Sequence, residues 1–351
     1  MPQPTASGKG TILITGANGG LGCAITSSIL SSPELRRYHG LYVVRNASSA
    51  RSLANTLKSA PDDYTYEVVQ LELSVLDNVR QIARDINARV ASRAIPSLRA
   101  LILAAGYMEL GGASSTTSEG FETSFVSNYL GHWLLSLMLL QSIDPAGGRI
   151  VVVSSHAYDV KHFLHKLDGY YEDEKWHLFF HDANIDAVAY GTWSRNEDDP
   201  LPRRAGVRRY GVAKMCAVMM VGELQRRLDQ DPSLEHVSIV GIDPGCMGNT
   251  GLCRRGNWFT RKVMFPILVP ALTPFVMWYN PNGTFRTVRK SSRDILEAAF
   301  GTDDSVRGRY LNGTELQDVV PEAADSEKRL MVWRDSVRYT ELTNADTCLA
   351  F

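Results

Sequence analysis

The sequence predicts an α/β fold, a doubly wound parallel sheet with helices on both of its faces. Three observations lead to this prediction. The first half of the chain alternates short apolar runs with helix-length segments, which is the pattern of successive β-α-β units. The apolar runs are nearly continuous in Val, Ile and Leu, as expected for strands that helices cover on both faces. A glycine-rich turn, residues 16–22, joins the first apolar run to the first helix-length segment.

The expected elements alternate along the chain. The expected strands cover residues 10–15, 41–45, 66–73, 98–104, 149–154 and 236–243. The expected helices cover residues 21–30, 47–59, 76–92, 119–142 and 210–230. None of the remaining stretches has the composition of an interdomain linker, and no segment repeats another. Residues 1–351 are therefore expected to form one domain.

Two segments exceed what a minimal fold of this class needs. Residues 156–209 lie between a strand and the helix expected at 210, and they are rich in aromatic residues, histidine and charge. Residues 250–290 follow the last long strand and are apolar and punctuated by proline. Insertions after the carboxyl ends of strands lie over the ligand crevice. Both segments are therefore expected to shape a substrate site, the first as an insertion and the second as a lid.

The composition gives no support for a nucleic-acid partner and favours a location in the cytoplasm. Lys and Arg total 37 against 38 Asp and Glu, a net charge of −1, so nothing favours nucleic acid as a partner. The five cysteines form no C-x-x-C pair, which is typical of reduced thiols. Residues 1–7 are polar and lack the apolar core of a signal peptide. A cytoplasmic protein is therefore expected.

The glycine-rich turn is a candidate phosphate site. Gly16 permits a tight turn after the first strand, Gly20 lets backbone N–H groups approach a pyrophosphate, and Gly22 allows the helix to pack closely on the strand. The N-terminus of that helix favours a bound negative charge. A plain glycine-rich turn would have the same composition, but the strand before it and the helix after it favour dinucleotide binding.

The end of the second expected strand bears on which dinucleotide is bound. Proteins of this fold that prefer NAD place an Asp or Glu there, about 20 residues after the glycines, to hold the ribose hydroxyls. This chain has Arg45 at the position and no carboxylate, and a guanidinium could pair with a 2′-phosphate. An arginine exposed to water is the simpler interpretation, yet the missing acid favours NADP(H) as the cofactor.

Polar residues that could carry chemistry follow in a fixed order. Ser154 and Ser155 come at the end of an expected strand, at the carboxyl edge of the sheet. Tyr210 and Lys214 stand four residues apart, on one face of an expected helix. On its own this pair could be an exposed phenol and a solvated lysine. Asn128 lies inside an apolar helix, where Asn is a mediocre residue and a buried one needs a reason.

Taken in order, these motifs resemble the short-chain dehydrogenase/reductase family. The matching elements are the turn at 15–22, residues 103–106, Asn128, residues 154–155, Tyr210 with Lys214, and residues 243–245. Together they cover roughly residues 10–250. The C-terminal stretches 308–313 and 330–336 are similar to the subgroup with retinol-dehydrogenase-like and protochlorophyllide-reductase-like members. Long chains of this kind also occur in fungal secondary metabolism.

The resemblance implies a Rossmann fold, a nicotinamide cofactor and a catalytic role for four residues. Tyr210 would protonate a carbonyl oxygen as a general acid, and Lys214 would favour the phenolate electrostatically. Ser155 would hold the carbonyl oxygen, and Asn128 would position a water that links Lys214 to solvent. The implied cofactor contacts are Gly16, Asn18, Gly20, Leu21, Gly22, Arg45, Glu72, Ala104, Ala105, Gly106, Tyr210, Lys214, Pro244, Gly245, Met247 and Thr250.

The chain departs from the family pattern in four places. Residues 103–106 read Leu-Ala-Ala-Gly where the family has Asn-Asn-Ala-Gly, so two amides that brace the cofactor loop are missing. Glu72 stands where Asp is usual, and the hydroxyl expected after the Pro-Gly pair comes one position late, at Thr250. Tyr210 follows Ser155 by 55 positions, a longer interval than in common members. None of these departures removes a catalytic group, but all four bear on the shape of the pocket.

The leading hypothesis is an NADPH-dependent reductase of a bulky, lipophilic ketone or aldehyde, which could also run as an alcohol dehydrogenase. Two alternatives stay open: a non-redox cyclisation or dehydration, and a non-catalytic protein that senses the cofactor. Two histidine pairs within residues 156–209 have metal-binding spacing, but this chemistry needs no metal and none is expected. A homodimer through the helices at 119–142 and 210–230 is a further expectation, although the C-terminal extension could cover those faces.

Residues 263–278 are almost entirely apolar. Three prolines within the run are expected to break a helix repeatedly, and the run is too short for a comfortable membrane span. Three interpretations compete: a lid over a lipophilic substrate, a contact between subunits, and a patch on a membrane surface. The lid leads because the run follows the strand that ends in the Pro-Gly pair. Basic residues at 254–255 and 261–262 keep peripheral membrane contact open.

Overall fold

The computed structural model describes residues 8–110, 114–199, 201–248, 250–252, 258 and 260–350. Within these residues one eight-stranded sheet forms, in the order β3-β2-β1-β4-β5-β6-β7-β8. Neighbouring strands are parallel except β7 and β8, which are antiparallel. The strands are β1 (Thr11–Thr15), β2 (His39–Val44), β3 (Tyr66–Gln70), β4 (Leu98–Leu103), β5 (Arg149–Val153), β6 (Ser238–Asp243), β7 (Tyr310–Asn312) and β8 (Glu315–Gln317). The predicted fold class is confirmed.

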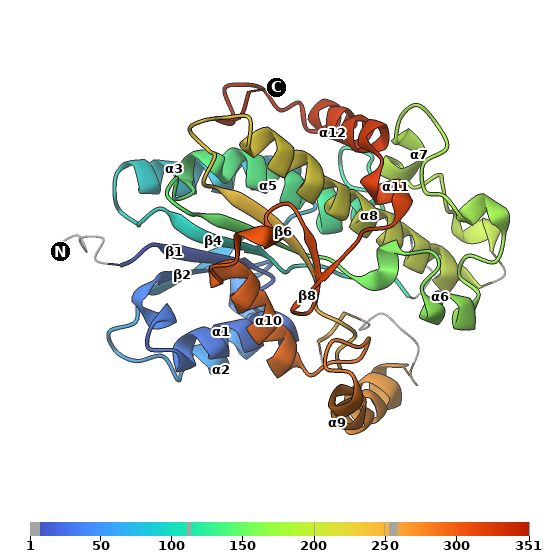
Figure 1. Ribbon diagram of the computed structural model, residues 1–351, viewed down its shortest axis with the longest axis horizontal. Coiled ribbons are helices and arrows are strands. Elements are labelled where there is room, and N and C mark those ends of the chain that lie inside the picture. Colours follow the sequence, from blue (N-terminus) through green and yellow to red (C-terminus); the bar gives the residue numbers. More distant parts are fainter. Residues whose placement is uncertain are drawn as a thin grey trace.

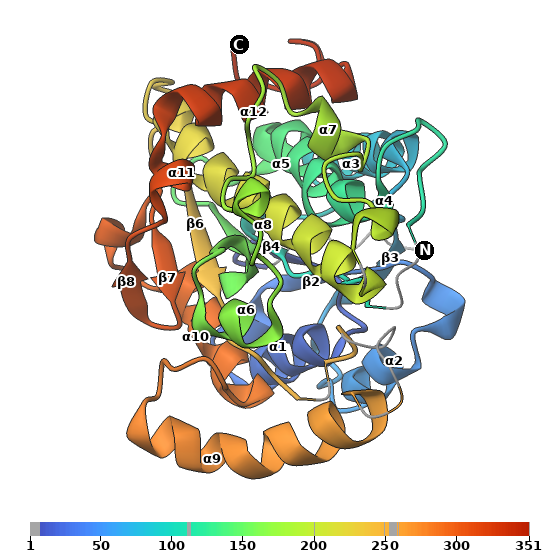
Figure 2. The same ribbon diagram turned by 90° about the vertical axis from the view of Figure 1, so that its right-hand side faces the viewer.

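Helices cover both faces of the sheet, as Figures 1 and 2 show. One face carries α1 (Gly20–Ser31), α2 (Arg51–Leu57) and α10 (Val288–Phe300), and the other carries α3 (Leu76–Ala91), α5 (Gly131–Leu139) and α8 (Pro202–Leu228). Two clusters of buried apolar side chains form the core, one on each side of the sheet. This three-layer arrangement leaves the strand ends as the place where a ligand can enter.

The first strand shows why the strands must be apolar throughout. All five residues of β1 are buried. Leu13 packs with side chains of α3 and α5, whereas Ile12 and Ile14 pack with side chains of α1. Successive side chains of a strand point to opposite faces, so helices on both sides demand apolar residues at every position. The strand order reverses between β1 and β4, which places the crevice at the carboxyl ends of these strands.

Some element boundaries differ from the expected ones. The expected helix at 210 is α8 and begins already at Pro202, a residue that suits the first turn of a helix, so Tyr210 lies well inside it. The segment expected at 119–142 begins as α4 (Thr123–Phe125) and passes through a π-helical turn, η3 (Val126–Leu130), before α5. Strands β7 and β8 were not predicted, because each has three residues and no apolar run.

The insertion folds as short helical turns that are fastened to the body. It contains the turns η5 (His156–Tyr158), η6 (Glu174–Trp176) and η7 (Asn196–Asp198) and the helices α6 (Phe163–Asp168) and α7 (Asp186–Ala189). Two buried arginines of α8 hold it. Arg208 pairs with Asp199 at 2.8 Å, and Arg209 pairs with Glu122 at 3.4 Å. The insertion is therefore part of the packed structure rather than a loop on its surface.

The C-terminal helices hold the insertion from the other side. α11 (Pro321–Ala324) and α12 (Ser326–Thr340) both pack on α8. The Glu322 carboxylate accepts hydrogen bonds from the backbone N–H groups of Phe179 and Phe180 at 3.0 and 3.1 Å, and Asp335 accepts one from Ile185 at 2.9 Å. In Figure 2, α12 lies on the outer side of α8.

The apolar run is helical throughout, so the prediction that its prolines would break a helix was wrong. A π-helical stretch, η8 (Thr260–Leu268), continues directly into α9 (Val269–Tyr279). Pro266 lies in the wider π-helical turns, and Pro270 lies in the first turn of α9, a position that tolerates proline. Pro274 removes one backbone donor from α9, while the Thr273 hydroxyl donates to the Val269 carbonyl at 2.6 Å.

Candidate active site

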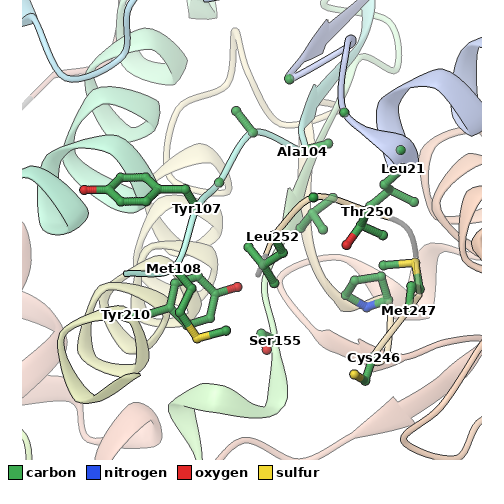
Figure 3. A pocket seen from close by; sticks show the side chains of 18 of the residues that line it. Leu21, Ala104, Tyr107, Met108, Ser155, Tyr210, Cys246, Met247, Thr250 and Leu252 are labelled. Atoms are coloured by element: carbon green, nitrogen blue, oxygen red, sulfur yellow. The ribbon is translucent and has the colours of Figure 1, made fainter. Parts of the chain in front are cut away.

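One cavity of about 1550 Å³ opens at the carboxyl ends of the central strands. Every residue predicted for catalysis or cofactor binding lines this cavity except Asn128. Figure 3 shows the Tyr210 hydroxyl pointing toward the centre of the cavity, on the same side as Ser155. Residues that are almost two hundred positions apart in the sequence thus share one wall, because the parallel strands all end at this edge.

The glycine-rich turn has the shape that a phosphate cradle needs. Gly16 has a φ of +70°, and a Cβ there would lie 2.7 Å from the Cα of Ala105. A Cβ on Gly22 would lie 2.4 Å from the Gly16 carbonyl oxygen. Only glycine fits at these two positions. Because α1 begins at Gly20, its free N–H groups and its positive end face the cavity, which suits a bound pyrophosphate.

The end of β2 presents a basic group and hydroxyls to the cavity. Arg45 is largely exposed, and its Nε lies 3.8 Å from Oε2 of Glu72, which also lines the cavity. Ser49 and Ser52, which follow Arg45 closely in the chain, line the same cavity. Asn18 has a second task, since its Oδ1 accepts the backbone N–H of Leu53 at 3.0 Å and so joins the glycine turn to α2.

Two residues that were not predicted brace the cofactor loop. The Ala105 N–H donates to the Thr15 hydroxyl at 3.1 Å, and that hydroxyl lies 2.9 Å from Nε2 of His132. Burial, together with the nearby Lys214 charge, lowers the pKa of His132 to about 3, so the ring is neutral and can accept the Thr15 proton. This contact braces the loop that lacks amides at 103–104, and a threonine ending the first strand was the available signal.

The tyrosine–lysine pair is buried on the inner face of α8. Both side chains are 4 % exposed, and Lys214 Nζ lies 5.6 Å from the centre of the Tyr210 ring. The ammonium donates to the Val153 carbonyl at 2.8 Å. Burial lowers the pKa of Lys214 to about 8, although the Asp243 carboxylate opposes this effect. A lysine held in this way stays mostly protonated at pH 7 and can exchange its proton readily.

The Ser155 hydroxyl lies at the junction of β5 and the insertion. Its oxygen accepts the Ala157 N–H at 3.2 Å and so caps η5, which leaves the hydroxyl proton available for a ligand. Ser154 also lines the cavity and is only 3 % exposed. Ser155 has the better-defined position of the two because the cap fixes its rotamer.

Asn128 lies behind the cavity wall rather than in it. The residue is in the π-helical turn η3, and its amide holds Tyr107 at both ends, accepting the N–H and donating to the carbonyl at 3.0 Å each. It also donates to the Ser124 carbonyl at 2.8 Å. A Cβ on Gly106 would lie 3.0 Å from its Oδ1 and 3.9 Å from Lys214 Nζ, so Gly106 separates the two groups. Asn128 therefore clamps the loop that follows β4.

A histidine–aspartate pair beside the serine was also missed. His156 lines the cavity, and its Nδ1 lies 3.6 Å from Oδ2 of Asp243. Burial raises the pKa of Asp243, but hydrogen bonding and charge from His156 and the Gly245 N–H outweigh it, so the pKa is lowered. The available sequence signal was that His156 directly follows Ser155 and that Asp243 directly precedes Pro244.

Both long segments form part of the wall, as predicted from their positions after strand ends. The insertion contributes polar groups, among them His165, Asp168 and Arg203. The helical run contributes an apolar face, made of Met264, Phe265, Leu268, Val269, Leu272 and Val276. Among the described residues, no group of three or more histidine, cysteine or acidic side chains is arranged to hold a metal ion.

Comparison with known proteins agrees with this geometry. A family model described as short chain dehydrogenase matches residues 10–165. The chain is 43% identical to the short-chain dehydrogenase iccH of Talaromyces variabilis, with 97% of this chain and 98% of that protein covered. It is 28% identical to protochlorophyllide reductase A of Arabidopsis thaliana, with 95% of this chain and 77% of that protein covered.

Solved structures share the fold at lower identity. An uncharacterised protein from Mycobacterium paratuberculosis has a TM-score of 0.58 at 22% identity, with 96% of this chain and 95% of that chain covered. The landomycin C-6 ketoreductase LanV, solved with bound NADP and rabelomycin, has a TM-score of 0.56 at 17% identity, with 88% of this chain and 98% of that chain covered.

Proposed function

Because the chain belongs to the short-chain dehydrogenase/reductase family, we propose that it is an NADPH-dependent ketoreductase of a bulky, lipophilic ketone or aldehyde. The observation that carries the proposal is the buried Tyr210–Lys214 pair, which lines the same cavity as Ser155. A phenol beside a lysine and a serine hydroxyl is the set of groups that protonates and holds a carbonyl oxygen.

The residues of the cavity fit a dinucleotide phosphate. Gly16 and Gly22 leave room for the pyrophosphate at the N-terminus of α1. Arg45, with no acid at its position, suits the 2′-phosphate that distinguishes NADPH from NADH. When bound, the nicotinamide supplies the hydride for the reduction. LanV, which has the same fold, was solved with NADP.

The chain's own residues supply the proton and the orientation. Ser155 donates a hydrogen bond to the substrate carbonyl oxygen and orients it toward Tyr210. Tyr210 donates its phenolic proton to that oxygen as negative charge develops there. The Lys214 ammonium, protonated at pH 7 because its pKa is about 8, stabilises the phenolate that remains. Lys214 can then return a proton to the phenol, since its own pKa is lower than that of a free phenol.

The walls of the cavity support a lipophilic substrate of secondary metabolism. The α9 side of the cavity is apolar, and the insertion side carries histidine, aspartate and arginine side chains. A substrate with an apolar body and a few polar groups matches such a wall. The 43% identical relative, a fungal short-chain dehydrogenase, and the ketoreductase LanV support the same class.

The proposal is tested with Tyr210→Phe. We expect oxidation of NADPH against a panel of hydrophobic ketones to fall by about a hundredfold or more, because the proton donor is lost. NADPH binding, followed by fluorescence titration, should change little. Tyr171→Phe is the matched control, because this buried tyrosine hydroxyl makes no hydrogen bond among the described residues.

The result also separates the alternatives. Equal turnover in Tyr210→Phe and in the wild type would refute the proposed mechanism. Tight NADPH binding without oxidation of the cofactor across the panel would instead favour a non-redox cyclisation or dehydration, or a protein that senses the cofactor.

A further inference from the structure

The helical run forms an exposed apolar ridge on the molecule. Figures 1 and 2 show α9 standing apart from the body, below α10. Four exposed apolar side chains of the run lie outside the cavity lining, Ile267 in η8 and Phe275, Trp278 and Tyr279 in α9, and we call them the α9 patch. Trp278 and Tyr279 are each 88% exposed, and Phe275 is 76% exposed. Soluble proteins leave such clusters exposed where another apolar surface or a membrane covers them.

The run is apolar on two sides, which separates it from an ordinary lid. Met264, Phe265, Val269 and Val276 face the cavity. A helix that only covered a cavity would carry polar residues on its outer side. Residues 262–279 instead have a mean hydropathy of 1.4 with 11% of the stretch buried, and by length and composition they could cross a membrane.

The chain path excludes a crossing and favours a helix lying at the surface. The segment that contains the run lies between Cys246 and Phe285, and these two residues form a β-bridge. The Cys246 N–H donates to the Thr284 carbonyl at 2.6 Å, and the Arg286 N–H donates to the Cys246 carbonyl at 3.0 Å. Because both ends are joined at one place, they lie on one side of any bilayer that the run touches. A single spanning helix would put them on opposite sides.

The charge of the segment complements an anionic bilayer. Residues 250–290 contain seven basic residues and no acidic one, although the whole chain has a net charge of −1. Two of the seven serve the fold, because Arg286 is buried and Lys290 pairs with Asp294 at 2.7 Å. Lys262, at the start of the run, is exposed, and so is Arg289, in the first turn of α10. Residues 254–255 lie outside the described residues. Tryptophan and tyrosine favour the interface between headgroups and acyl chains, and basic residues are attracted to anionic headgroups.

We propose that the α9 patch docks this protein on the surface of an anionic bilayer, with α9 lying in the interface. The other side of the same helix lines the cavity, so docking would bring the cavity wall next to the acyl chains where a lipophilic substrate dissolves. The docking does not rest on the reductase function, because it depends on exposed residues that are outside the cavity lining.

The test is co-sedimentation with vesicles of phosphatidylcholine alone or with about 30 % phosphatidylserine. The wild type should bind the anionic vesicles, and a triple variant, Phe275→Ser, Trp278→Ser and Tyr279→Ser, should lose affinity by at least about tenfold. The matched control replaces three exposed apolar residues elsewhere, Leu167, Leu178 and Tyr190, by serine and should bind like the wild type.

Two further measurements make every outcome informative. NADPH affinity should be unchanged in the triple variant, which shows that it is folded, and oxidation of NADPH with a water-soluble ketone tests the proposed function separately. Absence of vesicle binding by the wild type at low salt, or equal binding by the folded triple variant, would overturn the proposal. A wild-type dimer that the triple variant loses, without vesicle binding, would assign the patch to a second copy and overturn it as well.

Discussion

Arg45 sets the charge at the far end of the cavity. Its guanidinium is largely exposed and lies 3.8 Å from the Glu72 carboxylate. An exposed pair at this distance contributes only about 0–1 kcal/mol to stability, so the guanidinium keeps its capacity to bind another anion. Ser49 and Ser52 line the same cavity and carry hydroxyl groups that can donate to a bound anion. We therefore expect the cofactor preference to depend on this side chain more than on the shape of the turn.

Arg45→Asp is expected to invert the cofactor preference. The variant should bind NADPH about tenfold to a hundredfold more weakly, because a charge-assisted hydrogen bond to a phosphate is lost and a repulsive charge is added. NADH affinity should hold or improve, since an acid can bind ribose hydroxyls. Titration of both cofactors checks this. Arg51→Asp is the control, because Arg51 is exposed at the start of α2 outside the cavity lining, and an equal loss in both variants would contradict the prediction.

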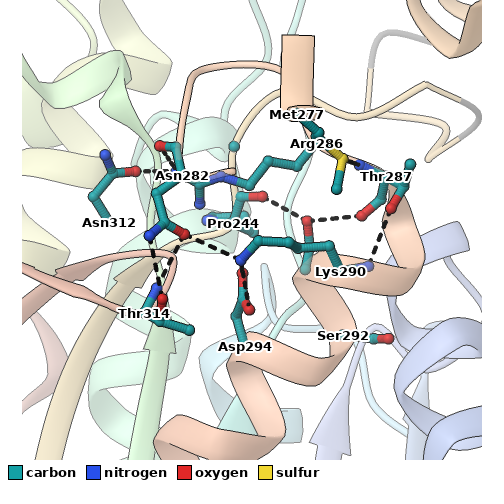
Figure 4. Close-up of polar contacts among 12 residues, drawn as sticks. Pro244, Met277, Asn282, Arg286, Thr287, Lys290, Ser292, Asp294, Asn312 and Thr314 are labelled. Atoms are coloured by element: carbon teal, nitrogen blue, oxygen red, sulfur yellow. Dashed lines mark hydrogen bonds and ion pairs between the residues drawn. The ribbon is translucent and has the colours of Figure 1, made fainter. Parts of the chain in front are cut away.

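At the scale of the elements, a network of hydrogen bonds at the C-terminal end of α9 holds this helix in position. Figure 4 shows Arg286 in the middle of this network. Arg286 is buried and donates to the Asp243 carbonyl at 2.7 Å, to the Gly283 carbonyl at 3.0 Å and to the side chain of Asn312. The guanidinium thus joins the end of β6, the end of β7 and the turn after α9. α9 is anchored at its C-terminal end by a residue that the sequence analysis did not single out.

Arg286→Met is expected to lower the free energy of unfolding by about 2–4 kcal/mol, because several buried carbonyl groups lose a charged donor at once. Urea denaturation followed by circular dichroism measures this loss. Arg289→Met is the matched control and should change stability by less than about 0.5 kcal/mol, because Arg289 is exposed on the next turn. Similar stabilities of the two variants would show that the Arg286 network does not stabilise the attachment of α9.

On the scale of the whole molecule, packing leaves histidines neutral inside the protein. Burial lowers the pKa of His132 and of His165 to about 3, with the Lys214 charge adding to the effect for His132 and the His156 charge for His165. An unfolded histidine has a pKa of about 6.5. The unfolded chain therefore binds protons more tightly than the folded chain between about pH 6.5 and pH 3, and acid favours unfolding in that window.

The free energy of unfolding should thus fall as the pH is lowered from 7 to 5, by about 2 kcal/mol for each such histidine. His132→Gln should make this decrease smaller, whatever its own effect on stability at pH 7. His236→Gln should not, because its side chain is 69% exposed. Urea denaturation at several pH values compares the slopes, and a His132→Gln slope equal to that of the wild type would contradict the interpretation.

The packing of the C-terminal helix α12 also bears on whether the protein can form a homodimer. α12 lies on α8, and its Trp333 packs edge-on against Trp133 of α5 at 5.3 Å between ring centres. The two helices named for a homodimer are therefore partly covered by the C-terminal extension. The homodimer stays a prediction, as do the cytoplasmic location and the organisation in one domain.

Much of the candidate site could be predicted because it consists of local motifs in a fixed order. The glycine turn, Arg45, Ser155 and the Tyr210–Lys214 pair all line the cavity. Thr15 with His132, and His156 with Asp243, were missed because each pair joins residues that are distant in sequence and individually ordinary. Asn128 was placed in the site by its motif, while its contacts put it behind the wall.

What the sequence determined by itself was the α/β class, the family and the set of candidate site residues, since hydrophobic periodicity and short motifs depend on neighbours along the chain. Only the tertiary structure decided which face each helix buries and where Arg286 anchors α9. It also decided that the proline-rich run is a continuous helix with exposed apolar side chains. These features depend on contacts between segments far apart in the chain, and burial in such contacts can override local propensity.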